Sequence, residues 1–177
     1  MKTISRLLAS LVLVATAGVA SAQMKAPTSS SYYGEVGYTA TSIGDSSLTF
    51  KPQLIRFVVG KDINQNLSVE GMFAPTIAKD TYRGVDIKAQ TYGVFLKPKL
   101  EIAKDTEAFA RLGWAKSQLD LSANGASVSS SDSSVAFGAG VQTQFNKDVY
   151  GQIDYLRFYS KDGVKADGLT FSVGTRF

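Results

Sequence analysis

The last ten residues, 168–177 (GLTFSVGTRF), alternate between two kinds of side chain. Successive side chains of an extended strand point to opposite faces, so a period of two predicts a strand with one apolar and one polar face. The polar face carries small residues and a single charge, Arg176. The other face consists of Leu169, Phe171, Val173, Thr175 and Phe177. The chain therefore ends in a predicted β-strand whose last residue is aromatic.

The first residues predict a secretory signal peptide. Lys2 and Arg6 form a short basic region, residues 7–20 form an apolar run without a charge, and Ala20-Ser21-Ala22 supplies a small-residue cleavage site. The apolar run is shorter than the roughly 20 residues that a membrane-spanning helix needs. A cleaved signal peptide over residues 1–22 is therefore favoured over an anchor helix.

The mature chain, residues 23–177, has the size of one domain. We expect residues 23–31 to be a disordered leader and residues 32–177 to form a single barrel domain. Removing Lys2 and Arg6 from the 19 basic residues leaves 17 against 15 acidic residues. This near balance predicts no nucleic-acid partner.

From residue 32 onward, alternating segments are separated by turn-forming residues, and we expect eight strands. Five of the segments alternate cleanly, and three mix polar and apolar residues on one face. The segments are 32–40, 50–60, 67–73, 85–96, 109–114, 135–145, 149–159 and 168–177.

The predicted connections alternate between short and long. The short ones are 62–66, 103–107 and 146–148; the long ones are 42–49, 75–84, 117–134 and 160–167. This order predicts a closed antiparallel up-and-down barrel with all long loops at one end, as in transmembrane barrels with short periplasmic turns and longer extracellular loops. The serine-rich segment 127–134 is a low-complexity loop in this prediction, and it serves either as an adhesive surface or as a hydrophilic cap.

The alternation alone also fits a soluble β-sandwich or lipocalin-like barrel, in which the apolar face is the core. The polar faces favour a membrane barrel, because they hold small residues with about one charge per strand. The interior of an eight-stranded barrel is just wide enough for side chains to fill. We predict a network of paired charges in this lumen. Its members are Glu35, Arg56, Glu70, Lys88, Arg111, Asp154 and Arg176.

The chain contains no histidine and no cysteine, which excludes histidine-dependent nucleophilic catalysis and thiolate metal sites. Glu35, Glu70 and Asp154 are better explained as partners of the lumen cations than as catalytic acids. We therefore predict no catalytic residue, no cofactor and no metal site.

With these features placed, residues 32–177 resemble the small OmpA/OmpX- or opacity-type outer-membrane β-barrels. The most specific part is the closing strand, where Leu169, Phe171, Val173, Thr175 and Phe177 match the alternating assembly signal of that superfamily. The resemblance implies a bacterial outer-membrane location, contact with outer-membrane lipid, insertion by the barrel-assembly machinery and surface-exposed loops. Unlike OmpA itself, the chain ends at the barrel, so we expect no periplasmic peptidoglycan-binding domain after it.

On this basis we expect a non-enzymatic outer-membrane protein with a structural or surface-interaction role and a lumen mostly blocked by paired charges. An extracellular ligand would bind the long loops. The alternatives are a narrow porin-like channel and a lipid-modifying enzyme, and the absence of histidine disfavours the enzyme.

Overall fold

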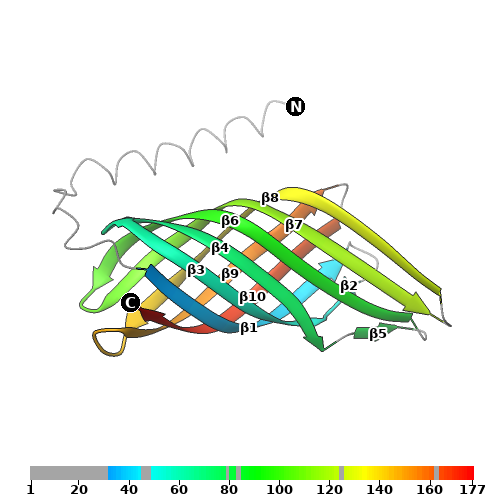
Figure 1. The fold of residues 1–177 in the computed structure, drawn as a ribbon, viewed down its shortest axis with the longest axis horizontal. Coiled ribbons are helices and arrows are strands. Elements are labelled where there is room, and N and C mark those ends of the chain that lie inside the picture. Colours follow the sequence, from blue (N-terminus) through cyan, green and yellow to red (C-terminus); the bar gives the residue numbers. More distant parts are fainter. Residues whose placement is uncertain (1–31, 45–48, 79, 83–84, 124–125, 162–163) are drawn as a thin grey trace, which may run out of the picture.

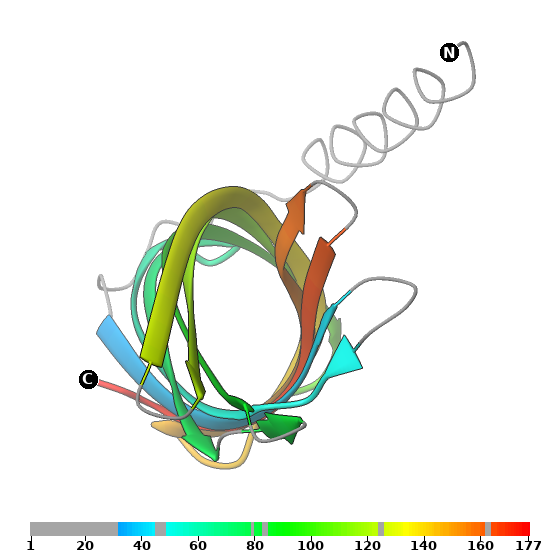
Figure 2. The same ribbon diagram turned by 90° about the vertical axis from the view of Figure 1, so that its right-hand side faces the viewer.

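A computed structural model describes residues 32–44, 49–78, 80–82, 85–123, 126–161 and 164–177. The predicted signal peptide and leader lie outside these residues. Eight long strands form one antiparallel sheet that curls into a closed barrel (Figure 1), and Figure 2 shows the closure along the barrel. This confirms the predicted fold class.

Two further strands, β2 and β5, are short and pair only with β1 and β6, respectively. The long strands contain 12 to 19 residues each. The bounds are β1 Tyr32–Gly44, β2 Thr49–Phe50, β3 Gln53–Asn64, β4 Leu67–Ala78, β5 Asp80–Tyr82, β6 Val85–Ala103, β7 Thr106–Ala123, β8 Ala126–Gln144, β9 Val149–Lys161 and β10 Val164–Arg176.

The barrel closes between its first and last long strands. β1 pairs with β10 in an unbroken antiparallel register that runs from Tyr33–Arg176 to Gly44–Lys165. Each long strand from β1 to β9 also pairs with the next long strand along the chain. Backbone groups that would otherwise form two sheet edges are therefore hydrogen-bonded to each other, as a sheet in hydrocarbon requires.

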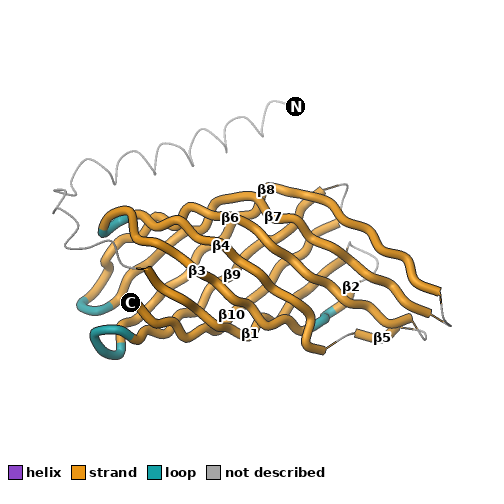
Figure 3. Tube along the Cα trace, in the orientation of Figure 1, coloured by secondary structure: helices purple, strands orange, loops and turns teal. Residues whose placement is uncertain are grey.

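Figure 3 shows the turns after β3, β6 and β8 at the same end of the barrel as the C-terminus. We call this end, which carries Tyr32 and Phe177, the proximal end, and the opposite end the distal end. The predicted gathering of the short turns with the chain ends is thus observed.

Side chains alternate between the barrel interior and its outer face along every long strand. In β1 the side chains of Tyr33, Glu35 and Thr39 are buried, whereas Val36 and Tyr38 are exposed. The exposed residues of all the strands together form a broad apolar belt. The lumen is lined by polar and charged side chains over much of its length. This arrangement inverts that of a water-soluble barrel.

The prediction of a long loop over 117–134 is wrong. β7 continues to Ala123 and β8 begins at Ala126, so the two strands form an extended hairpin that stays paired up to Ala123–Ala126. The preference of a residue for strands depends strongly on its context. Pairing with β7 extends the strand through the serine-rich segment, because each added residue continues an existing hydrogen-bond ladder.

A β-bulge separates the distal part of β9 from the rest. Arg157 pairs with Asp167 and Tyr159 pairs with Ala166, which leaves Phe158 as the extra residue. Beyond the bulge, Tyr159 packs against the buried apolar cluster that includes Phe158 and Ala166.

Among the described residues, the structure contains no helix with the length and apolar character needed to cross a membrane.

The apolar belt leads to a test of which face meets lipid. Leu96 in β6 is 50 % exposed and lies between the exposed side chains of Val69 and Leu112 on the neighbouring strands. We expect Leu96→Arg to lower the free energy of unfolding in phospholipid bilayers by about 2–4 kcal/mol, because a cation is moved into hydrocarbon. The control is Val128→Arg in the distal hairpin, which should leave stability within about 0.5 kcal/mol. Equal stability of both variants in denaturant titrations would contradict the outward assignment.

Candidate functional site

Three carboxylates and three cations meet inside the barrel, and all six side chains are almost completely buried. They come from six different strands, so the group joins most of the barrel wall across its lumen. We call this group the central charge cluster. Its members are Glu35 (β1), Arg56 (β3), Glu70 (β4), Lys97 (β6), Arg111 (β7) and Asp154 (β9).

Arg111 contacts all three carboxylates of the cluster. Its Nη2 lies 2.9 Å from Glu35 and 3.1 Å from Glu70, and its Nη1 lies 2.9 Å from Asp154. Arg56 donates from Nη1 to the other oxygen of Asp154 at 2.8 Å. Lys97 completes the cluster with Nζ 3.2 Å from Glu35 and 3.3 Å from Glu70.

Neutral side chains satisfy further oxygens of the two glutamates. The Tyr33 hydroxyl donates to Glu70 at 2.8 Å, and the Tyr150 hydroxyl donates to Glu35 at 2.8 Å. Gln152 donates from Nε2 to Glu35 at 2.7 Å. Burial of an ion pair is tolerated when both charges are matched and additionally hydrogen-bonded, and these contacts meet that condition.

Two inward-facing glycines make room for the tyrosine rings. A Cβ atom on Gly60 would lie 2.1 Å from the ring of Tyr33, and one on Gly174 would lie 2.3 Å from the ring of Tyr150. Neither approach is possible for a larger residue without moving the ring. The glycines thus allow both rings to cross the narrow lumen with their hydroxyls on the glutamates.

A second group of charges lies at the proximal end of the lumen. Asp62 accepts from Lys99 Nζ at 2.7 Å, from Arg176 Nη1 at 2.8 Å and from the Ser68 hydroxyl at 2.6 Å. Arg176 also lies 4.0 Å from Glu107. We call these five residues the proximal charge group. Like the central cluster, it has as many carboxylates as cations.

The structure places five of the seven predicted network residues in the central cluster and Arg176 in the proximal group. The assignment of Lys88 to the lumen is wrong. Lys88 is exposed on the outer face of β6, opposite Asp120 of β7, while Ala89 and Thr91 are buried. Lys88 shares the face of Tyr92, which the strict alternation of β6 directs outward.

Sequence reasoning missed four charged residues of these groups: Asp62, Lys97, Lys99 and Glu107. The alternation continues past the predicted end of the strand at residue 96, with Leu96 and Leu100 exposed and both lysines buried. Extending the period of two by four residues would have found the lysines. Asp62 was assigned to a turn, but β3 runs to Asn64.

The closing strand, β10, pairs with β1 at the seam where the barrel closes. Leu169, Phe171 and Val173 are exposed on the outer face, as predicted. The Phe177 N–H donates to the Tyr32 carbonyl at 2.9 Å, and the Tyr32 N–H donates to the Phe177 carbonyl at 3.1 Å. Thr175 pairs with Gly34 in the same register.

Among the residues that the structure describes, the distal part of β8 has a backbone partner on one side only. Its ladder with β9 ends at Phe137–Arg157, whereas its ladder with β7 continues to Ala123–Ala126. Residues 126–136, within the part of the chain that the structure describes, therefore form an edge. We call them the β8 edge.

Contacts that reach the β8 edge from β9 involve side chains. Lys161 Nζ donates to Asp132 at 2.7 Å, the Tyr159 hydroxyl donates to the same carboxylate at 3.1 Å, and the Ser160 N–H donates to the Ser134 hydroxyl at 3.3 Å. The hydrogen bond from Lys161 lowers the pKa of Asp132 below its usual range. These contacts anchor one part of the edge and leave its backbone ladder incomplete.

The hydrogen bonds at the proximal end of β8 show which of its residues direct their backbone N–H and C=O groups toward β7 and which direct them toward β9. The Gln144 N–H donates to Asp105 in the turn before β7 at 2.8 Å, and the Phe145 N–H donates to Val149 of β9 at 2.9 Å. Backbone groups of an antiparallel strand alternate between its two neighbours, and the β7–β8 register has no shift. Odd-numbered residues of the β8 edge, such as Ser129 and Ser131, therefore direct N–H and C=O to the open side.

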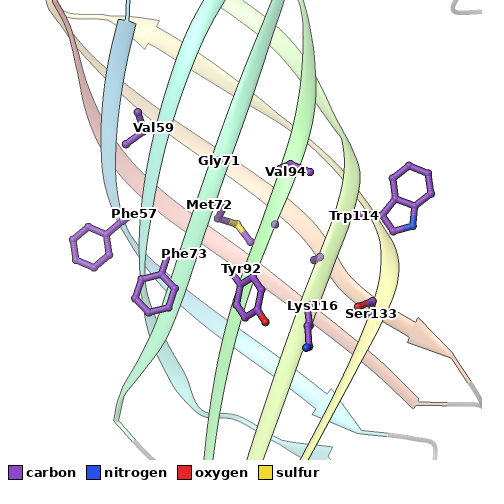
Figure 4. Close-up of a pocket in the computed structure, with 12 residues that line it drawn as sticks. Phe57, Val59, Gly71, Met72, Phe73, Tyr92, Val94, Trp114, Lys116 and Ser133 are labelled. Carbon is purple, nitrogen blue, oxygen red and sulfur yellow. The ribbon is translucent and has the colours of Figure 1, made fainter.

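A shallow groove of about 580 Å³ lies on the outer face of the barrel. Figure 4 shows the residues that line it, which come from β3, β4, β6, β7 and β8. Gly71 leaves it open, and Phe73, Tyr92 and Trp114 border it. Because all three rings belong to the exposed apolar belt, the groove is part of that surface.

Within the described ranges, no group of three or more histidine, cysteine, aspartate or glutamate residues is arranged to hold a metal ion.

Comparison with known proteins agrees with this geometry. The chain is 29 % identical to the attachment invasion locus protein of Yersinia enterocolitica over 178 aligned positions, which cover 93 % of this chain and 95 % of that protein. The family model described as outer membrane protein beta-barrel domain matches residues 10–177.

Two solved structures share the fold. The crystal structure of Ail, the attachment invasion locus protein of Yersinia pestis, in complex with the heparin analogue sucrose octasulfate, has a TM-score of 0.67 and 22 % identity and covers 85 % of this chain and 100 % of that one. Neisserial surface protein A has a TM-score of 0.71 and 13 % identity, and the alignment covers 82 % of this chain and 97 % of that one. The chain belongs to the outer membrane protein beta-barrel family and is a protein of the bacterial outer membrane.

Proposed function

We propose that this barrel is a non-enzymatic surface-attachment protein that binds an extended segment of an extracellular protein along the β8 edge. The observation that carries this proposal is the one-sided ladder over residues 126–136. This segment lies at the distal end, opposite the turns and the C-terminus, and faces the outside if the short turns are periplasmic. The 29 % identity to an attachment invasion locus protein supports the same role.

The composition of the β8 edge suits strand addition. Proteins usually protect exposed edges with prolines, several charges or bulges. This edge contains one charge, Asp132, no proline, and a regular register with β7. An extended peptide gains affinity from main-chain hydrogen bonds when it adds to such an edge, and the small serines leave room for its side chains.

We propose in addition that the central charge cluster blocks the lumen. Its side chains come from opposite walls and are joined by direct ion pairs, and both charge groups are internally balanced. An ion entering this space would have to separate matched pairs in a medium of low dielectric constant, which costs several kcal/mol per charge. A narrow porin-like channel is the alternative.

The location also bears on export and assembly. We propose that residues 1–22 are removed on export and that residues 23–31 remain as a leader before the barrel. We further propose that the barrel-assembly machinery recognises the outward residues of the closing strand. These residues are Leu169, Phe171, Val173, Thr175 and Phe177.

Planar-bilayer recordings test the blocked lumen. The unmodified protein should give no steady single-channel steps. Replacing Glu70 and Arg111 together by Ala removes one charge of each sign and much of the cluster's volume, so discrete steps should appear. The matched control is the outer-face pair Lys88→Ala with Asp120→Ala, which should stay silent. Steady steps from the unmodified protein would favour the porin-like channel.

Proline substitution tests the β8 edge. Ser129→Pro with Ser131→Pro removes two N–H donors from the open side and keeps the ladder with β7. Loss of two hydrogen bonds of about 1 kcal/mol each should weaken attachment of bacteria displaying the protein to epithelial cells by about 30-fold in affinity.

The matched control is Ser129→Ala with Ser131→Ala, which removes the hydroxyls and keeps both donors. It should attach like the unmodified protein. Surface amounts are equalised with an antibody, and heat-modifiable gel mobility checks folding. The proposal fails if the proline variant attaches normally, or if the unmodified protein gives no attachment above the empty host.

A further inference from the structure

The distal half of the lumen differs in chemistry from the half that holds the charges. Leu54, Ala74 and Ala89 form a buried apolar cluster there, and Ile43 and Leu119 pack against it. The interior of a membrane barrel is ordinarily polar. An apolar lining in this half is therefore not explained by the barrel architecture alone.

These side chains do not fill the space between them. A cavity of about 230 Å³ remains at the distal mouth, bordered mainly by apolar side chains from β1, β3, β6, β7, β9 and β10. An apolar cavity of about 150 Å³ is large enough to bind benzene. The principal lining residues are Ile43, Leu54, Ala89, Leu119, Phe158 and Ala166.

The cavity is closed toward the proximal end. Thr39 follows Thr41 as the next inward residue of β1, and Thr170 follows the inward Gly168 in β10. The hydroxyls of Thr39 and Thr170 lie 2.9 Å apart, and both residues are fully buried. Arg56, the next inward residue after Leu54 in β3, is held by Asp154. A molecule that enters from the distal side thus meets a floor, and the geometry suits binding rather than passage.

Most polar residues of the lining have hydrogen-bond partners within the protein. They are Thr41, Thr91, Ser117, Gln118 and Asp132. Thr91 and Ser117 lie 3.0 Å apart through their hydroxyls, and Thr41 donates to the carbonyl of Pro52. Asp132 at the rim accepts from Tyr159 and Lys161. A charged ligand would lose hydration in this space and would have to displace these bonds to regain it.

We propose that the distal half of the lumen binds a small uncharged apolar molecule, of about the size of one substituted benzene ring. The β8 edge contributes Ser130 and Asp132 to the lining, but the ligand would occupy the space between inward side chains and not the open backbone ladder, so failure of this proposal leaves the proposed attachment function untouched. The buried side chain of Phe158, which continues the inward alternation of β9 after Leu156, supplies an aromatic face for such a ligand.

Methyl NMR of the full chain in phospholipid nanodiscs, titrated with toluene, tests this proposal. The inward methyl groups of Ile43, Leu54 and Leu119 should show saturable shifts. The outward methyl groups of Leu96 and Leu112 report partition of toluene into lipid and should change without saturation. Benzoate, which has a similar ring and a charge, should leave the inward methyl groups unchanged.

Ala89→Phe places a ring in the cavity and should weaken toluene binding by at least about tenfold. Ala139→Phe adds the same ring on the exposed outer face and should bind like the unmodified protein. Ala166→Leu fills the cavity from the opposite wall and replaces Ala89→Phe if that variant does not fold. The proposal is overturned if the inward shifts do not saturate, if benzoate binds as well as toluene, or if filling the cavity leaves binding unchanged.

Discussion

A sheet that crosses hydrocarbon cannot leave backbone N–H and C=O groups unpaired, and the rest of this structure depends on that constraint. The pairing of β1 with β10 satisfies it by joining the first and last long strands of the sheet. In the closed barrel, side chains along each strand point alternately to the lipid and to a lumen that is just wide enough for side chains. Polar residues of the strands are thereby collected in one confined space.

The lumen accommodates these residues by pairing opposite charges at two positions along the barrel, in the central charge cluster and in the proximal charge group. Arg111 bridges the three carboxylates of the central cluster, and Asp62 organises the proximal group. Gly60 and Gly174 supply the space that two buried tyrosine rings need. Interior side chains therefore brace the barrel wall from within, while the distal half of the lumen remains apolar and partly open. The distal hairpin of β7 and β8 contributes Leu119, Ser130 and Asp132 to the lining of this open space, and its β8 edge is the proposed attachment site.

Much of the fold could be predicted from the sequence, because a period of two sets strand identity and facing together. The charged residues were found wherever the predicted strand was long enough. Lys97 and Lys99 were missed since their strand was ended at residue 96, and Lys88 was assigned to the wrong face of that strand. The inward position of Tyr159 depends on a bulge at Phe158, which no local pattern indicates. The extended hairpin likewise reflects pairing rather than intrinsic preference.

Solid-state NMR in lipid bilayers tests the central claim most directly, by detecting amide contacts across the seam together with side-chain contacts to acyl chains. The account predicts cross-peaks between Val36 and Val173, and between Tyr38 and Phe171. It also predicts acyl-chain contacts from Val36 and none from Glu35. Absence of the seam cross-peaks, or acyl contacts from Glu35, would contradict a closed barrel with its charges inside.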